Sequence, residues 1–422
     1  MKKLVFALSI IALFIACHKD DPKENEVKAD RTVLVYISGE CSLWDFVDYD
    51  LDEMKNGSQT IGDNNLLVYV DRGYSHGKPN EQQEIPWLAR IHKGQFVDSV
   101  SIKDIVNEMN LTPAKTSVTD DPYASDPQVM EGVLRYAFKK YPSKNNDYGL
   151  VLWGHGTGWL IKDSIGYNAL ARQKAYGVDN GKNADTDNGI WLNIPTMAKM
   201  LSKLPHLTFI FGDCCHTMCL EVAYELRHVT DYLIGTPAEI PGEGAPYQTV
   251  VPALFEKTTF WKSIVDRYYE QRAGGYDVPL SVIKTSEMEN MANATKTVLK
   301  SIAPKFEGGY PDMSNLIYYY YDFSNYQEFY DANDFILKYA EEGDYNSWKQ
   351  ALDKTVIYKK MATRWMTNKY PWSTYYGDFE VTENHYGGVS MFVPKYILQH
   401  TDNDYIKQMG WYYAAGYSDI GW

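Results

Sequence analysis

The chain has 422 residues, of which 45% are hydrophobic and 23% charged, as in soluble proteins with more than one folding unit. Its formal net charge of −14, with no basic patch, excludes nucleic acid as an expected partner. Three of the five cysteines lie within six positions of one another, which argues against a spaced disulfide framework.

The N-terminal region has the pattern of a processing signal followed by a tether. Two lysines precede an apolar stretch over residues 4–16, which is too short to span a membrane but suits a signal-peptide core. Phe-Ile-Ala before Cys17 resembles a bacterial lipoprotein box, in which the cysteine becomes the lipidated first residue; an ordinary signal peptide cut nearby is the alternative. The acidic pair that follows resembles a surface-export signal of Bacteroidetes lipoproteins. We therefore predict a signal peptide over 1–17, a disordered tether over 18–30, and lipid anchoring in the outer membrane with surface exposure.

The next part of the chain alternates between patterns typical of strands and of helices. Apolar runs predict buried strands, and apolar periodicity predicts helices. Asp126 suits a helix N-cap, and the proline after it suits the first turn. The expected elements are strands at 31–38 and 66–71, a short helix at 45–54, a hairpin over 88–100 and a helix at 126–141.

Two further buried strands end in residues that carry chemistry. One covers 148–153 and leads to His155, which stands between two glycines; the other covers 207–211 and leads through Asp213 to Cys215. Ligands bind outside the carboxyl ends of strands in open α/β sheets, and a thiol near a helix N-terminus has more thiolate character. The two strand ends therefore suggest a Cys–His dyad, with the imidazole as base to the thiol.

The remaining elements complete an α/β fold. The alternation of strands and helices predicts a mostly parallel sheet flanked by helices, and a change of composition near 303–309 predicts a subdomain boundary. The expected elements are a polar loop at 156–189, helices at 191–204, 286–302, 331–342, 345–362 and 405–417, and strands at 232–236, 280–283 and 388–394.

Alternative nucleophiles and roles remain open at this stage. Side chains alternate along an extended segment, so Asp213 and Cys215 share a face while Cys214 points the other way. Cys219, one turn into the next helix, is expected to be a small core residue. The alternative for His155 is that of a core histidine, although its flanking glycines favour close approach of a ligand. The alternative for Asp213 is that its side chain only caps the following helix.

The motifs as a whole resemble a known enzyme family. Leu-Trp-Gly-His-Gly-Thr-Gly-Trp at 152–159 and Asp-Cys-Cys…Glu-Val-Ala-Tyr-Glu-Leu at 213–226 are similar to the two signature blocks of the clostripain family of cysteine peptidases. The resemblance extends over roughly 32–422. It implies a caspase-like fold over 31–304 and a mainly helical C-terminal subdomain over 305–422 that packs on it.

The resemblance also implies roles for individual residues. His155 and Cys215 would form the dyad, and Asp213 would lie at the base of a pocket for Arg or Lys. The backbone N–H groups of Gly156 and Cys215 would supply the oxyanion hole. This chain departs from the family pattern at Cys214, where a small residue is usual, and in the loop Thr-Pro-Ala-Glu at 236–239, where a serine and acidic residues are expected.

Metals and cofactors are not indicated by a motif. A zinc site from His155, Asp213, Cys215 and His216 lacks zinc-ligand spacing, and His216 and His228 are expected at the surface. Calcium affects some clostripain-like enzymes, and Asp179, Asp185 and Asp187 are candidate oxygen ligands, but without EF-hand spacing. We therefore expect no required cofactor.

The predicted function is that of an exported cysteine endopeptidase that cuts proteins or peptides after Arg or Lys. Long exposed loops are where nicking concentrates, so self-cleavage is expected within 162–182, after Lys162, Arg172, Lys174 or Lys182. A catalytically inactive, surface-binding lipoprotein of the same fold is the competing hypothesis.

Overall fold

The computed structural model describes residues 29–72, 85–116, 120–160, 175–181, 187, 189–271, 277–306, 309–321, 327–366, 381–394 and 405–422. The predicted signal peptide, Cys17 and residues 18–28 of the tether lie outside this part of the chain. The last two tether residues belong to the fold, since Ala29 forms a β-bridge with Ser143 and Asp30 pairs with Lys144. Within the described residues, no helix combines the length and apolar sequence that crossing a membrane requires.

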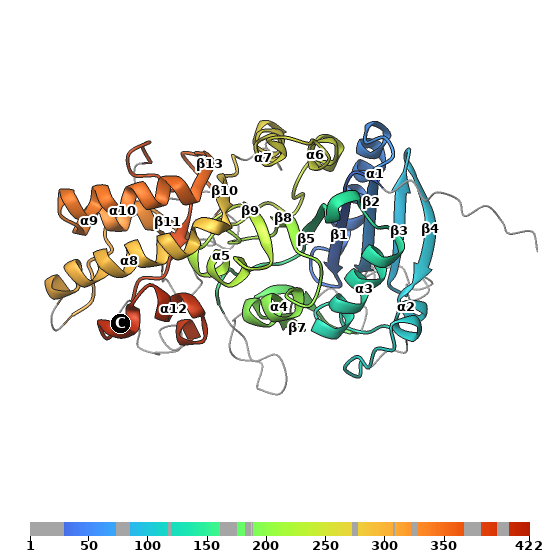
Figure 1. Ribbon diagram of the computed structural model, residues 1–422, viewed down its shortest axis with the longest axis horizontal. Coiled ribbons are helices and arrows are strands. Elements are labelled where there is room, and N and C mark those ends of the chain that lie inside the picture. The colour runs from blue at the N-terminus through green and yellow to red at the C-terminus, as the bar shows by residue number, and fades with distance from the viewer. Residues whose placement is uncertain are drawn as a thin grey trace, which may run out of the picture.

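A nine-stranded sheet forms the centre of the molecule, in the order β13-β10-β9-β8-β5-β1-β2-β3-β4 (Figure 1). The five central strands, from β9 to β2, are parallel, and the outer pairs on both sides are antiparallel. The predicted mostly parallel sheet and the predicted hairpin are thus confirmed. The strands are β1 (Thr32–Gly39), β2 (Asn65–Arg72), β3 (Trp87–His92), β4 (Gln95–Ser101), β5 (Tyr148–Trp153), β8 (Leu207–Asp213), β9 (Thr230–Gly235), β10 (Leu280–Lys284) and β13 (Val356–Lys360).

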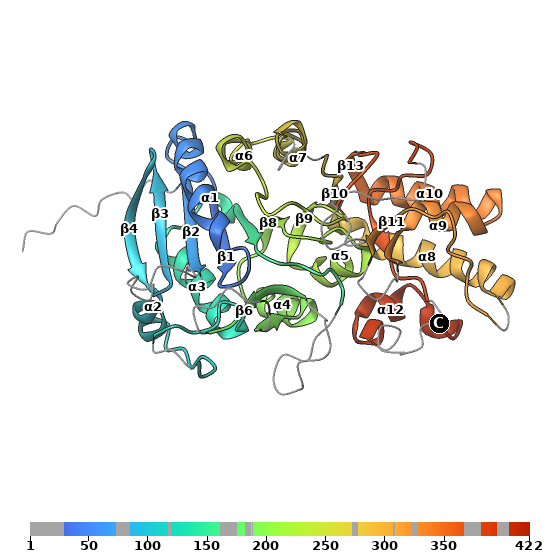
Figure 2. The ribbon, with the colours of Figure 1, turned by 180° about the vertical axis from the view of Figure 1, so that it is seen from behind.

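Helices cover the two faces of this sheet, and the sequence of each strand explains the layers. Along β1, Val33, Val35 and Ile37 face a core formed with α1, α6 and α7, while Leu34 and Tyr36 face the core under α2, α3, α4 and α5. Figure 2 shows the same layers from behind, with α8, α9, α10 and α12 gathered at the end of the sheet far from β4. The helices are α1 (Trp44–Gly57), α2 (Ile102–Glu108), α3 (Pro127–Lys140), α4 (Ile194–Leu201), α5 (Leu220–Leu226), α6 (Tyr247–Leu254), α7 (Phe260–Gln271), α8 (Met288–Ile302), α9 (Ala332–Tyr339), α10 (Glu342–Thr355) and α12 (Gly410–Ala414).

Several predicted elements differ in kind or length from the observed ones. The segment predicted as one helix over 191–204 begins with β7 (Ile190–Leu192), and the predicted loop before it contains β6 (Tyr176–Asp179), which pairs with β7. Residues 356–360, predicted as helix, form the edge strand β13, and the strand expected over 388–394 is reduced to β14 (Ser390–Met391). The helix expected over 405–417 is the short α12 between single turns of 3-10 helix.

The segment after residue 305 is joined to the rest of the chain by backbone pairing as well as by packing. β13 hydrogen-bonds to β10, and a small sheet of β11 (Tyr318–Tyr321), β12 (Gln327–Asp331) and β14 lies beyond it. This segment therefore contains strands in addition to the expected helices. The division at 304 into two domains stays a prediction.

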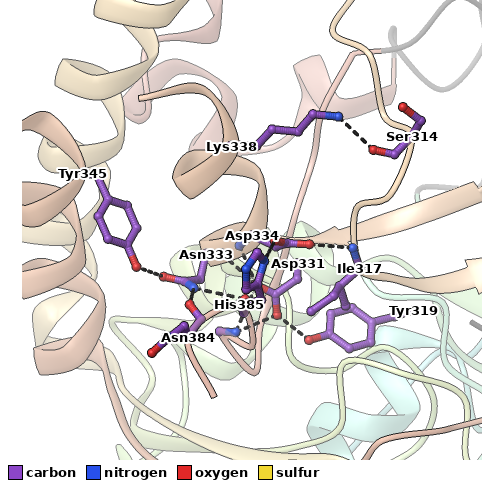
Figure 3. A network of polar contacts seen from close by, with 11 residues as sticks. Ser314, Ile317, Tyr319, Asp331, Asn333, Asp334, Lys338, Tyr345, Asn384 and His385 are labelled. Carbon is purple, nitrogen blue, oxygen red and sulfur yellow. Dashed lines mark hydrogen bonds and ion pairs between the residues drawn. The ribbon is translucent and has the colours of Figure 1, made fainter. Parts of the chain in front are cut away.

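A buried carboxylate organises this C-terminal segment (Figure 3). Asp331 caps the N-terminus of α9 by accepting hydrogen bonds from the N–H groups of Asn333 and Asp334, and it also accepts them from Gly387 and Gly388. The hydroxyl of Tyr319 donates to the same carboxylate. One fully buried side chain thus joins the start of α9 to Tyr319, 12 residues before it, and to Gly387, 56 residues after it.

Candidate active site

The register of two parallel strands brings the two predicted catalytic residues to the same edge of the sheet. In the pairing of β5 with β8, Trp153 stands opposite Asp213. Each strand then continues two residues further, to His155 and to Cys215. Parallel neighbours end at the same edge, so the two side chains come from corresponding positions beyond the last paired residues.

The glycines around His155 allow this close approach. Gly154 has φ of +142°, a conformation that other residues rarely adopt. A Cβ atom on Gly156 would lie 2.6 Å from the backbone oxygen of Cys215 and 3.0 Å from the Cβ of Cys214. The backbone of residue 156 therefore packs directly against the backbone that carries the thiol.

The four described cysteines differ sharply in burial. Cys41, Cys214 and Cys219 are buried, whereas Cys215 is partly exposed. Burial raises the pKa of the Cys214 thiol to about 12 and that of Cys219 well above its usual range. Cys214 faces inward, beside a cavity of about 20 Å³ that has room for roughly one water molecule. The backbone N–H of Ile240 donates to the Cys215 sulfur at 3.4 Å.

The imidazole of His155 has two polar neighbours that the sequence did not indicate. Its Nε2 lies 2.9 Å from the hydroxyl oxygen of Ser42 and 3.2 Å from a carboxylate oxygen of Asp187. Ser42 in turn donates to Asp187 through its hydroxyl and its backbone N–H. Because a carboxylate only accepts hydrogen bonds, the contact with Asp187 favours the tautomer whose proton is on Nε2, which leaves Nδ1 as the acceptor atom of the ring.

Asp213 lies beneath the strand end rather than on its surface. Its carboxylate accepts hydrogen bonds from the Ala245 N–H at 3.0 Å, from the Tyr247 hydroxyl at 2.8 Å and from the Tyr268 hydroxyl at 3.3 Å. Burial raises its pKa to about 6, against the lowering effect of these donors. The helix-cap alternative is wrong, because α5 begins seven residues later and is preceded by Cys219.

Two predictions for neighbouring histidines have different outcomes. His228 is exposed as expected, but His216 is buried, so its assignment to the surface is wrong. Its ring stacks on Phe329 with centroids 4.5 Å apart, and its Nδ1 lies 3.0 Å from the Pro237 oxygen. Burial lowers the pKa of His216 to about 4, so the ring is neutral and holds the loop that follows β9.

That loop, residues 236–246, forms one side of the site. Ile240 contacts the Cys215 sulfur, Ala245 contacts Asp213, and the half-buried Glu239 directly precedes Ile240 in sequence. The loop thus carries a second acidic residue one position before its contact with the thiol. The sequence signal for it was the acidic residue after Thr-Pro-Ala.

Two groups of described side chains have the spacing of metal ligands. One consists of Cys41, His155 and Asp187, and the other of Glu40, Asp71 and Asp179. The candidate calcium ligands Asp179 and Asp187 therefore fall in separate groups, and Asp185 lies outside the described residues. In the first group, His155 and Asp187 both contact Ser42, and these contacts account for the short distance between the two side chains.

Comparison with known proteins agrees with this geometry. The sequence model of the clostripain family matches residues 35–420. The chain is 30% identical, with a TM-score of 0.71, to a secreted C11 cysteine protease from Bacteroides thetaiotaomicron solved with an irreversible peptide inhibitor; 93% of this chain and 100% of that one are covered. An inactive zymogen C11 protease from Parabacteroides distasonis is 28% identical, with a TM-score of 0.71 and coverage of 92% and 98%. Comparison with the curated proteins finds no match.

The contact between Asp187 and His155 predicts a measurable effect on the thiol. Asp187→Asn removes the charge that fixes the ring, so alkylation of Cys215 by iodoacetamide near neutral pH should slow by about tenfold. Labelled peptides measured by mass spectrometry give the rate for each cysteine. The matched control is Asp231→Asn, which alters the exposed His206–Asp231 pair and should leave the rate unchanged. Equal rates in wild type and Asp187→Asn would show that Asp187 does not position His155.

Proposed function

Because this chain belongs to the clostripain family of cysteine peptidases, we propose that it is an exported endopeptidase that cuts after Arg or Lys. Cys215 is the nucleophile and His155 is the base in this proposal. The observation that carries it is the shared register of β5 and β8, which brings His155 and the partly exposed Cys215 to one edge of the sheet. The buried Cys214 and Cys219 are poor candidates for the nucleophile, since their thiols stay protonated at neutral pH.

The proposed reaction uses few groups. His155 takes the thiol proton, and the thiolate of Cys215 attacks the peptide carbonyl carbon. The N–H groups of Gly156 and Cys215 stabilise the oxyanion of the tetrahedral intermediate. His155 then gives its proton to the departing amine, leaving a thioester. Water attacks the thioester with His155 as base, which releases the acid product and restores the thiol.

The proposed preference for cationic residues rests on buried negative charge beside the thiol. Asp213 precedes Cys215 by two residues and is bonded by two neutral hydroxyls and one N–H. A guanidinium or ammonium group forms stronger, charge-assisted hydrogen bonds with a carboxylate than a tyrosine hydroxyl does. Glu239, on the loop that contacts the thiol, is a second candidate for the same recognition.

This proposal predicts a pH-dependent preference between two matched peptides that differ only in Arg or citrulline at the cleavage site. Asp213 is ionised above its pKa of about 6 and neutral below it. The ratio of kcat/KM for Arg over citrulline should be about tenfold or more at pH 7.5 and should fall as the pH drops through 6. Titration of the Cys215–His155 pair affects both peptides equally and cancels in the ratio.

Two variants complete this test. Cys215→Ala should abolish cleavage of both peptides, and full activity in it would refute the nucleophile assignment. Asp213→Asn should cut the Arg preference and remove its pH dependence while Cys215 still reacts with iodoacetamide. If Asp213→Asn keeps the preference and Glu239→Gln loses it, recognition belongs to the loop carboxyl instead.

The self-cleavage proposal concerns a segment whose cut sites lie outside the described residues. The chain on either side of that segment is well anchored, because the Thr157 N–H donates to the Ala175 oxygen at 2.8 Å. The fragment carrying β5 and the fragment carrying β8 would stay together through the pairing of those strands. A relative described as an inactive zymogen supports an activation step in this family.

Self-cleavage should be visible on a denaturing gel. Purified wild type should run as two fragments, and Cys215→Ala as a single chain, because the cut needs the thiol. N-terminal sequencing of the C-terminal fragment should begin after Lys162, Arg172, Lys174 or Lys182. An intact wild-type chain with full peptidase activity would refute the hypothesis.

The proposed location is the outer membrane, through a lipid on Cys17. A described relative is a secreted protease, which supports export. Cys17→Ala should move the protein from the membrane fraction to the soluble fraction of fractionated cells, measured by immunoblot. A variant that remains with the membrane would point to another anchor.

A further inference from the structure

The imidazole of His155 lies among side chains of the kinds that bind zinc. Ligand atoms of Cys41, His155 and Asp187, one from each residue, all lie within 4.8 Å of one another. They are a sulfur, a ring nitrogen and a carboxylate oxygen, which are the three ligand types that zinc takes in proteins. Calcium and magnesium prefer sets made of oxygen alone, so this donor set favours a thiophilic cation.

Strand pairing and one serine bring these side chains together. Cys41 follows β1 and His155 follows β5, and these two strands are parallel neighbours in the sheet. Asp187 lies between β6 and β7, where it accepts hydrogen bonds from the hydroxyl and the backbone N–H of Ser42. Ser42 therefore explains why Asp187 lies near His155. It does not account for the Cys41 thiol, which makes a weak contact of 3.8 Å with the Ser38 oxygen.

We propose that Cys41, His155 and Asp187 bind an inhibitory zinc ion. Zinc bonds of about 2.0–2.3 Å place tetrahedral ligand atoms roughly 3.3–3.8 Å apart. Nε2 of His155 already lies 3.2 Å from an Asp187 oxygen, so small rotations of the side chains suffice to complete the set. Three protein ligands leave the fourth position to water, which reaches it because the side chains of His155 and Asp187 are 23% and 30% exposed. The set shares only His155 with the zinc ligands considered from the sequence.

The charges around Cys41 suit a divalent cation. Burial raises the pKa of the Cys41 thiol, and the charges of Asp187, Asp179 and Glu40 raise it further. Without metal the thiol therefore carries its proton, which it releases to solvent when zinc binds. The same acidic groups attract the cation, and this attraction offsets part of the cost of losing the proton.

A zinc ion on Nε2 would remove the base from the proposed reaction. With its proton on Nε2, the ring of His155 offers Nδ1 as the acceptor of the Cys215 proton. Zinc takes the lone pair of Nε2, so the neutral ring carries its proton on Nδ1 instead and has no nitrogen left to accept another. Removal of zinc restores the base. This inhibitory consequence rests on the proposed function, whereas zinc binding itself does not.

Cobalt provides a test of binding that does not depend on peptidase activity. Co²⁺ replaces zinc at such sites, and a thiolate ligand gives it a charge-transfer band in the near ultraviolet. The protein is prepared as Cys215→Ala with its thiols kept reduced, so that the proposed nucleophile cannot contribute to the band. The band should appear on addition of Co²⁺, disappear on addition of zinc, and be absent when Cys41→Ala is added to Cys215→Ala. The matched control adds Cys219→Ala, which removes another fully buried cysteine, and should keep the band.

Zinc affinity tests the other ligand. In the Cys215→Ala background, the Kd for zinc is measured by competition with a chromogenic chelator. Asp187→Asn and Cys41→Ala should each weaken binding by at least about tenfold, since loss of a ligand costs no less than loss of a partner that orients one. Asp231→Asn, in the exposed His206–Asp231 pair, should leave the Kd unchanged.

Inhibition is measured on protein that keeps Cys215, with each variant compared with its own zinc-free rate. Zinc should slow both the alkylation of Cys215 by iodoacetamide and the cleavage of the Arg peptide, and EDTA should restore both rates. In Cys41→Ala, the zinc concentration that halves these rates should rise by at least about tenfold. If the chain cleaves no peptide, the proposed function fails, but the cobalt band and the alkylation rate still test the zinc site.

Three outcomes would overturn the proposal. Equal zinc sensitivity of wild type and Cys41→Ala, or loss of zinc binding in Cys215→Ala, would show that the cation binds the Cys215–His155 pair itself. Absence of the cobalt band from Cys215→Ala would show that Cys41 is not a ligand.

Discussion

The parallel pairing of β5 with β8 is the constraint on which the site depends. Because Trp153 pairs with Asp213, the residues that follow the two strands lie at corresponding positions. A slip of one position would turn every side chain to the other face and separate the imidazole from the thiol. The glycine at 156 completes the arrangement, since any larger residue would collide with the backbone at Cys215.

Buried acidic residues also gather near the carboxyl ends of the strands, and their carboxyl groups have different surroundings. Asp213 receives hydroxyl and N–H donors, and Asp50 accepts a hydrogen bond from the Trp153 indole at 2.6 Å. The Asp71 carboxyl accepts no hydrogen bond among the described residues, and the charges that raise its pKa most are those of Asp179, Asp121 and Glu40. Neutral donors thus stabilise Asp213 and Asp50, whereas Asp71 lies among other carboxyl groups.

The sequence predicted most of the sheet and the neighbourhood of the thiol, because uninterrupted apolar runs followed by glycine leave little ambiguity about a buried parallel strand. It failed at β13, where Val356 to Lys360 continue the periodicity of α10 and only pairing with β10 makes them a strand. Contacts between segments that are distant in sequence could not be predicted from local patterns either. Nothing local distinguishes Ser42 or Asp187 as neighbours of His155, and His216 looked like a surface residue because its stacking partner, Phe329, follows more than 100 residues later.

The two outer strands of the sheet have a consequence for the solubility of the molecule. The outermost pairing on each side is interrupted by a bulge, between Leu88 and Arg90 on one side and between Val282 and Ile283 on the other. β13 ends in two lysines, and β4 carries Asp98 in a left-handed conformation. Bulges and charges at sheet edges prevent the unpaired N–H and C=O groups from adding a strand of another chain. The wide sheet can therefore expose both ends without offering a template for edge-to-edge aggregation.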